Sequence, residues 1–408
     1  MKQGWEIKKL VDISSHLGDG LHGTPKYTTD GDYYFINGNN LTDGIIEFKE
    51  STKRVSVDEY KKYKKNLNDR TILVSINGTL GNVAFYNNEK IILGKSACYF
   101  NLLESVDKNF IKYILSSPYF LNYAHKEATG ATIKNVSLKT MREFEIPLPS
   151  LPEQQRIVAI LDEAFAAIAK AKANAEQNLK NAKELFESYL GTLFTKLFQT
   201  REKKTISEVA KIIGGYSFKS TDFIKEGKYQ VIRMGNVRPG IIRENENPVF
   251  IDKLDEKALT KALLLPNDVI ITQTGTKKKR DYGFTVIIEK KNYLLNQRIA
   301  SIRFSDKYLP KFFLYFSWTN LFKDQYFANE TGTVGQGNVG ISAITDAEIP
   351  FIPVKEQMLI IDRIDELRIE TQRLETIYQQ KINDLEELKK SVLQKAFNGE
   401  LKTEKDIV

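Results

Sequence analysis

An internal repeat with a period of about 200 residues constrains this 408-residue chain more than any other feature. Residues 145–148 (Glu-Ile-Pro-Leu) return at 348–351 (Glu-Ile-Pro-Phe), and Glu153-Gln154 returns at Glu356-Gln357 with the same offset of 203. Such a period is far longer than that of a solenoid repeat, so it indicates duplication of a whole domain.

Smaller matches occur in the same order along the two halves. Their offsets are 203, 202 and 197 residues, and the members of the last pair each follow an apolar run. The matched dipeptides are Asn135-Val136 with Asn338-Val339, Thr129-Gly130 with Thr331-Gly332, and Gly78-Thr79 with Gly275-Thr276.

Each half begins with a segment of β character that is rich in glycine, asparagine, threonine and aromatic residues. Short apolar runs such as 91–93 and 285–288 predict strands. One short helix is expected in each segment, at residues 109–116 and 309–318. We therefore predict an α+β chain of two β-rich mixed domains, each followed by a long helix. The predicted boundaries are 1–150 and 201–353 for the domains, with 151–200 and 354–408 for the helices and tail.

Both long helices have recognisable ends. Ser150 and Pro152 suit the start of the first, which is expected over residues 152–196 and would be about 65 Å long at roughly 1.5 Å per residue. The second is expected to begin near Lys355 and to stop near Asn398-Gly399, since glycine is a common helix terminator.

Apolar or small residues recur every seven positions along both helices. This pattern predicts an antiparallel intramolecular coiled coil with pseudo-two-fold symmetry. The alternative is that each helix packs only on its own domain, but the stripe is longer than a 150-residue domain can cover. The predicted seams are Ile157, Ala164, Ala171 and Leu185 with Leu161, Ile168, Ala175, Ala182 and Tyr189, and Ile364, Thr371, Tyr378, Leu385 and Val392 with Ile360, Leu367, Leu374 and Leu388.

Composition narrows the class of protein further. Lys plus Arg total 60 against 52 Asp plus Glu, a net charge of +8, which favours a polyanionic partner without proving one. One cysteine and three histidines offer no zinc-ligand set. The start lacks a signal-peptide core and no run is apolar enough to span a membrane, so a cytoplasmic protein without a membrane partner is expected.

The duplicated junctions resemble those of the specificity subunits of type I restriction-modification systems. The residues that carry the resemblance are Ile146 to Gln154 and Ile349 to Gln357, supported by Asn77 to Thr79, Thr274 to Thr276 and the opening Gly4-Trp5-Glu6. The resemblance covers essentially the whole chain. One departure is Lys355, which stands where the first junction has Pro152, so the second helix is expected to start less sharply.

The resemblance implies that each β-rich part is a target recognition domain that reads half of a split site on double-stranded DNA. It implies that the helices act as a spacer and dock two methyltransferase subunits, which restriction subunits can join. S-adenosylmethionine, ATP and Mg²⁺ are then expected only on those partners, and this chain is expected to hold no cofactor and to be no enzyme. No Pro-Pro pair is present, as an Asn/Asp-Pro-Pro-aromatic methyltransferase motif would require.

Two other classes of function stay open. Asp268, Glu289 and Lys291 loosely imitate the acidic pair and lysine of a metal-dependent nuclease, although Asp268 also suits a turn before a strand. A coiled-coil adaptor that binds only proteins is the other alternative.

Base reading needs polar side chains in exposed loops, and phosphate contacts need cations. Asymmetric half-sites are expected, because the two domains differ almost everywhere between the junctions. The candidates in the first domain are His22, Thr24, Lys26, Tyr27, Asn77, Thr79, Lys134 and Asn135. Those in the second are Lys219, Arg233, Asn236, Arg238, Gln273, Thr274, Lys277, Lys278, Lys279, Arg280, Gln297, Arg298, Gln336 and Asn338.

Overall fold

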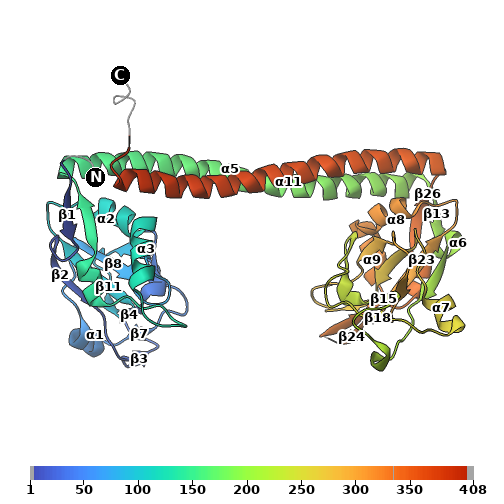
Figure 1. Cartoon of the computed structure of the whole chain (residues 1–408), viewed down its shortest axis with the longest axis horizontal. Coiled ribbons are helices and arrows are strands. Elements are labelled where there is room, and N and C mark those ends of the chain that lie inside the picture. Colours follow the sequence, from blue (N-terminus) through green and yellow to red (C-terminus); the bar gives the residue numbers. More distant parts are fainter. Residues whose placement is uncertain (1–3, 334, 402–408) are drawn as a thin grey trace, which may run out of the picture. The chain divides into compact units, whose positions relative to one another are not determined.

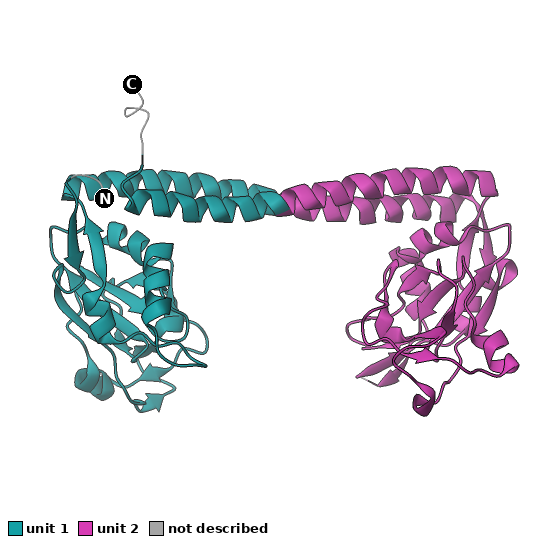
Figure 2. Ribbon diagram, viewed as in Figure 1, with its two compact units in different colours: residues 1–176, 380–408 teal, residues 177–379 magenta. Residues whose placement is uncertain are grey.

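The computed structural model describes residues 4–333 and 335–401, and the chain divides into two compact units. The first unit covers residues 1–176 and 380–408, and the second covers 177–379 (Figure 2). Each unit contains one β-rich globular part and a segment of both long helices, so the predicted fold class is confirmed.

The globular part of the first unit is built mainly from short strands. In chain order its elements are β1 (Glu6–Lys9), β2 (Ser14–Asp19), β3 (Tyr27–Thr28), β4 (Tyr33–Ile36), η1 (Gly38–Asn40), β5 (Leu41–Thr42), β6 (Ile45–Ile46), β7 (Arg54–Val55), α1 (Val57–Tyr63), β8 (Thr71–Ser75), β9 (Val83–Phe85), β10 (Ile91–Leu93), β11 (Ala97–Leu102), α2 (Lys108–Leu115), α3 (Pro118–Glu127), α4 (Leu138–Glu143) and β12 (Glu145–Leu148).

Two four-stranded sheets form the centre of this part. The antiparallel sheet has the order β2-β11-β8-β9, and the mixed sheet has the order β10-β4-β7-β3 with β10 and β4 parallel. Every residue of β8 is buried, as its continuous apolar run predicts for a strand covered on both faces. Figure 1 shows α2 next to β8. Ile72 and Val74 pack in the core that contains α2, whereas Leu73 packs with Ile36 and Leu93 from the second sheet.

The second unit repeats this plan with different residues. Its elements are β13 (Glu202–Thr205), α6 (Ile206–Val209), β14 (Ala210–Gly214), η2 (Ser220–Asp222), β15 (Tyr229–Ile232), η3 (Met234–Asn236), β16 (Val237–Arg238), β17 (Ile241–Ile242), β18 (Phe250–Ile251), α7 (Glu256–Ala262), β19 (Val269–Thr272), β20 (Thr274–Gly275), β21 (Thr285–Ile287), β22 (Tyr293–Leu295), β23 (Ile299–Phe304), α8 (Pro310–Ser317), α9 (Asn320–Phe327), β24 (Thr331–Thr333), β25 (Gln336–Asn338), α10 (Ser342–Thr345) and β26 (Glu348–Phe351).

Strand order makes the repeat explicit. The sheet β14-β23-β19-β21 corresponds to β2-β11-β8-β9, and the parallel pair β15-β22 corresponds to β4-β10. The predicted short helices are α2 and α8, but one helix per domain was too few. A second helix follows each of them, and α3 was missed because it buries only Phe120 and Ala124, too few apolar residues to show a helical period.

The two long helices are α5 (Leu151–Thr200) and α11 (Val354–Phe397), and they pack antiparallel. In the first unit the Lys172 ammonium lies 2.7 Å from the Glu386 carboxylate. In the second unit Arg201 lies 2.5 Å from Glu356. A later residue of α5 therefore pairs with an earlier residue of α11, as it does in antiparallel helices. Gly399 follows α11 with a left-handed φ of 74°, as predicted for its terminator.

The predicted seam is only partly correct. Ile157, Leu161, Ala175 and Ala182 are buried, but Leu185 is 49% exposed. On α11, Leu388 is 48% exposed, and Ile382, which the pattern omitted, is buried instead. A seven-residue repeat drifts by about 20° per heptad against a straight helix, so the buried face moves to neighbouring positions.

The glutamine at each junction fastens a globular part to its helix. Gln154 is 1% exposed, accepts the backbone N–H of Asp107 at 2.8 Å, and donates to the carbonyl of Pro149 at 2.9 Å. Gln357 is 0% exposed and makes the equivalent bonds to the N–H of Leu309 and the carbonyl of Ile352, both at 2.8 Å. The glutamine of the duplicated Glu-Gln motif therefore has a structural cause, because its amide supplies both a donor and an acceptor to the junction.

Candidate nucleic-acid interface

Five loops of the second unit surround two adjoining hollows of about 550 and 540 Å³. The loops are residues 233–238, 246–247, 274–281, 296–298 and 335–336, and Arg298 lines both hollows. We call the two hollows together the loop groove. Its lining includes the predicted residues Arg233, Asn236, Arg238, Thr274, Gln297, Arg298 and Gln336.

The loop before β16 is shaped by a buried asparagine. Asn236 accepts the backbone N–H of Arg233 at 3.1 Å and donates to the carbonyls of Arg243 and Glu246. These bonds satisfy backbone groups inside a non-helical loop. The side chain of Asn236 is 3% exposed, so its amide fixes the loop that presents Arg233 and Arg238.

Gln273 and Thr274 join the next two loops in the same way. The backbone N–H of Gln273 donates to the carbonyl of Arg298, and the carbonyl of Gln273 accepts from the backbone N–H of Val339, each at 2.9 Å. Its side chain also donates to the carbonyl of Val339, and the Thr274 hydroxyl donates to the Asn338 amide oxygen at 2.9 Å. Both residues are buried and hold the groove wall.

The first unit contains an equivalent set of loops. Asn77 donates to the Asn135 side chain at 3.0 Å, as Thr274 does to Asn338. Gly78 bonds to the carbonyl of Lys134 at 2.9 Å. The structure therefore brings together residues 77–79 and 129–135, which the sequence predicted as two separate candidate loops.

The remaining candidates differ in exposure and surroundings. Gln297 accepts a hydrogen bond from the Ser217 hydroxyl at 3.2 Å, and His22 lies 2.6 Å from Asp19. Lys219 does not line the loop groove. Asn77, Asn135, Arg233, Arg238 and Lys277 are half-buried, and the exposed candidates are His22, Thr24, Lys26, Tyr27, Thr79, Lys134, Lys219, Lys278, Lys279, Arg280, Gln297, Arg298, Gln336 and Asn338.

The comparison with protein families decides which group of proteins this is. The model for the type I restriction modification DNA specificity domain matches residues 2–180 and 199–387. The chain belongs to the specificity subunits of type I restriction-modification systems. It is 23% identical to the EcoKI specificity subunit of Escherichia coli K12 over an alignment of 432 positions, which covers 98% of this chain and 90% of the relative. It is 21% identical to the Escherichia coli EcoBI specificity subunit over 356 residues, which cover 81% of this chain and 73% of that one.

Solved structures of specificity subunits share the fold. The HsdS subunit from Thermoanaerobacter tengcongensis matches with a TM-score of 0.63 at 17% identity, over 98% of each chain. A chain from a structural study of complex assembly and conformational transition of the type I R-M system matches with a TM-score of 0.73 at 16% identity, over 98% of this chain and 99% of that one. Specificity subunits of this family are non-catalytic.

The geometry around Asp268 argues against the nuclease alternative for the specificity subunit. Asp268 is 1% exposed, and both its oxygens lie 2.7 Å from the guanidinium of Arg303. A third bond comes from the backbone N–H of Leu265 at 2.9 Å. These bonds occupy the carboxylate that a metal would need. Among residues 4–333 and 335–401, no cluster of three His, Cys, Asp or Glu could hold a metal ion, and no helix is long and apolar enough to cross a membrane.

Sequence reasoning missed one repeated loop of the specificity subunit. Residues 36–46 and 232–242 share the pattern Ile-x₃-Asn-x₃-Gly-Ile-Ile with an offset of 196. Asn40 makes the same bonds as Asn236, accepting from the N–H of Asn37 and donating to the carbonyl of Glu47, both at 3.0 Å. Asn37 therefore corresponds to Arg233, and it joins the candidates of the first unit.

Two further candidates of the first unit follow β10 at positions equivalent to those that follow β22. Lys95 corresponds to Gln297, since their backbone N–H groups bond to the carbonyls of Leu21 and Tyr216. Ser96 corresponds to Arg298, and its hydroxyl donates to the Asn37 side chain at 3.0 Å. The signal available in the sequence was that each pair lies one residue beyond the end of an apolar run.

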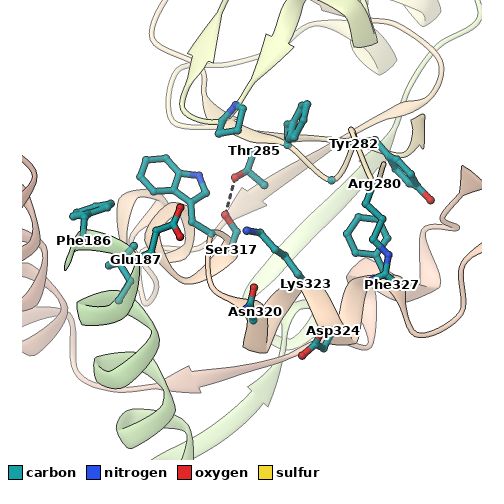
Figure 3. A pocket seen from close by; sticks show the side chains of 15 residues that line it. Phe186, Glu187, Arg280, Tyr282, Thr285, Ser317, Asn320, Lys323, Asp324 and Phe327 are labelled. Carbon is teal, nitrogen blue, oxygen red and sulfur yellow. Dashed lines mark hydrogen bonds between the residues drawn. The ribbon is translucent and has the colours of Figure 1, made fainter. Parts of the chain in front are cut away.

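A separate pocket of about 490 Å³ lies beside α5 in the second unit (Figure 3). Phe186, Glu187, Lys323, Asp324 and Phe327 are among its lining, and the Thr285 and Ser317 hydroxyls bond across its wall. Much of this lining is aromatic and contributed by helices. It shares only a few residues with the loops that line the loop groove, so we do not count the pocket as part of the candidate interface.

Proposed function

We propose that this specificity subunit binds an asymmetric, bipartite site on double-stranded DNA, with one half-site read by each β-rich domain. The observation that carries the proposal is a repeated loop framework whose outward residues differ. Asn40 and Asn236 hold equivalent loops, yet the exposed Lys95 in the first unit is replaced by the exposed Gln297 in the second. Different hydrogen-bonding groups in the same position select different base edges.

The proposed reading domains are residues 1–150 and 201–353. Exposed polar residues of the groove loops would contact base edges, and the cations of the hairpin at 277–280 would contact phosphates. Lys278 and Lys279 are exposed and suit this role because phosphate contacts require charge rather than fixed geometry. Asn236, Gln273 and Thr274 would hold the loops without touching DNA.

We further propose that the helices at 151–200 and 354–397 dock two methyltransferase subunits, which restriction subunits join. Large apolar side chains are exposed along α11, where neither the partner helix nor a domain covers them. Large exposed apolar patches are typical of interaction sites, and these side chains are candidates for one. The residues are Met358, Leu359, Ile369, Ile377 and Leu388, with exposures of 54%, 65%, 63%, 48% and 48%. The methyltransferase subunits would supply the S-adenosylmethionine chemistry.

Mapping of methylated adenines in a host that expresses the whole complex tests the proposal. The expected result is a split motif with two different halves. Lys95→Ala is expected to change only one half, and Gln297→Ala only the other. A symmetric motif, or a variant that alters both halves together, would contradict the assignment of one half-site to each domain.

The role of the helices as a spacer has a separate test. Matched insertions of a few residues near Asn178 and Leu374 are expected to lengthen the unread spacer while both half-sites stay the same. Changed half-sites with a constant spacer would refute the spacer role. Loss of every DNA contact in the presence of the methyltransferase partners would instead favour a protein-only adaptor.

A further inference from the structure

Arg298 lines both hollows of the loop groove, as Met234 and Gly235 do, and among the described residues it is the one charged residue that they share. Its side chain is exposed, and within the described part of the chain its guanidinium has no hydrogen bond, ion pair or aromatic partner. The other groove arginines are engaged. Arg233 donates to the carbonyl of Asn247, and Arg238 donates to the carbonyl of Val237 at 2.8 Å.

The backbone of Arg298 holds a conformation that residues with a Cβ atom rarely adopt. Its φ is +68°, in the left-handed region. Hydrogen bonds on either side fix this conformation, from the N–H of Gln273 to the Arg298 carbonyl and from the N–H of Gln297 to Tyr216, each at 2.9 Å. Strained backbone that is fixed by its surroundings is typical of ligand-contacting positions.

Acidic side chains in the groove lining disfavour a phosphate as the partner of Arg298. Asp281 lines one hollow and Glu246 the other. The backbone N–H of Thr276 bonds to Asp281 at 2.6 Å and holds the pKa of that carboxyl below its usual value, so the carboxylate is charged at neutral pH. The Asp281 carboxylate would repel a phosphate in the hollow that it shares with Arg298, whereas Glu246 is already paired with Arg243 at 2.9 Å. A base edge carries no net charge, so it would meet no such repulsion.

From these observations we infer that Arg298 reads a guanine in the half-site bound by the second domain, through paired bonds to its O6 and N7 atoms. The inference rests on the proposed function and names the base that one residue of the groove selects. Arginine matches these two acceptors because its guanidinium presents two parallel N–H groups. The first domain has Ser96 at the equivalent position, so it lacks this contact.

The test uses the whole complex with its methyltransferase partners and DNA duplexes that carry the mapped target. Each G·C pair of the half-site is changed in turn, and binding is measured by competition. In the wild-type complex one guanine change is expected to weaken binding by roughly 5- to 150-fold, the range of a bidentate base contact. In Arg298→Gly that position is expected to accept all four pairs within about threefold, with other positions unchanged.

Two further variants control for loop disorder and for loss of charge. Arg298→Asn also tolerates a left-handed backbone, and it is expected to lose the same guanine preference. Lys253→Asn removes one charge from an exposed position that lines neither hollow, and it is expected to bind as the wild type does.

A uniform loss of affinity for all duplexes in Arg298→Gly and Arg298→Asn would overturn the inference, because it would indicate a phosphate contact. Unchanged discrimination in both variants would also overturn it. A wild-type complex with no preference at any position of this half-site would refute the proposed function itself, so the two failures are distinguishable.

Discussion

Substitution of Gln357 by alanine tests the physical reason for the repeated Glu-Gln junction. The buried amide accepts from the N–H of Leu309 and donates to the carbonyls of Lys307 and Ile352, at 2.8, 3.1 and 2.8 Å. Alanine would leave three backbone groups without this partner. The N–H has a single hydrogen, so its loss dominates, while each carbonyl keeps a second lone pair for another donor.

The cost follows from these bonds. An unsatisfied buried donor costs about 1–3 kcal/mol, and the void left by the amide adds roughly another 1 kcal/mol. We therefore expect Gln357→Ala to destabilise the second unit by about 3 kcal/mol. Since every 1.4 kcal/mol is a factor of ten, amide hydrogen exchange in α8 should accelerate about 100-fold where it follows opening of this unit.

Hydrogen exchange followed by mass spectrometry on the full chain separates the two units. Exchange in α2 of the first unit should stay unchanged in Gln357→Ala, and Gln154→Ala should produce the reverse pattern. Gln372→Ala is the matched control, because Gln372 is exposed on the same helix α11. Equal acceleration in both units, or less than threefold in α8, would refute the assignment of the junction amides as local anchors.

Three further predictions concern other parts of the second unit. Asp268→Asn removes the charge of a buried carboxylate whose partner Arg303 is 34% exposed, and it should lower the free energy of unfolding by roughly 1–3 kcal/mol in calorimetry. A change below about 0.5 kcal/mol would contradict it. Burial, assisted by a carboxylate of α11, raises the pKa of Tyr315 to about 12. Its neutral phenol therefore stabilises the fold below pH 10, and this contribution is lost as the pH rises from 10 to 12. Tyr315→Phe should flatten the loss of stability over that window in urea titrations, and an identical slope would show the reasoning wrong. Replacing Lys278 and Lys279 by glutamine should make the dependence of DNA binding on salt less steep. The slope of the logarithm of the binding constant against the logarithm of the salt concentration should become smaller in magnitude by up to about 1.8, equally for specific and unrelated duplexes.

The duplicated junctions and the helix ends could be predicted from the sequence, because the residues there have roles that few side chains can perform. Gln154 supplies a donor and an acceptor to one buried corner, and Gly399 adopts a left-handed conformation at a helix end. The seam was less predictable. Leu185 fits a strict heptad but lies on the exposed side of α5, because a seven-residue repeat does not match the turn of a straight helix.

The candidate interface was predictable as a set of loops but not side chain by side chain. Gln273 and Asn236 are residue types that commonly read bases, yet both are buried and bonded to backbone groups. A polar residue in a glycine-rich loop can point to solvent or satisfy the loop itself, and composition does not distinguish these cases. The loop of Asn40 was missed although its offset of 196 is close to the 197 of the matched Gly78 and Gly275.

The loop framework separates the residues that hold the interface from those that would select DNA. Asn40 and Asn236 are both asparagines at equivalent positions, and the amide of each donates to a backbone carbonyl. Ser96 and Arg298 differ completely, although β10 and β22 place them equivalently. Arg298 donates no hydrogen bond within the described residues, so replacing it leaves no buried group without a partner. Substitution of Arg298 should therefore change the preferred base at little cost in stability, whereas substitution of Asn236 should unfold the loop that presents Arg233 and Arg238.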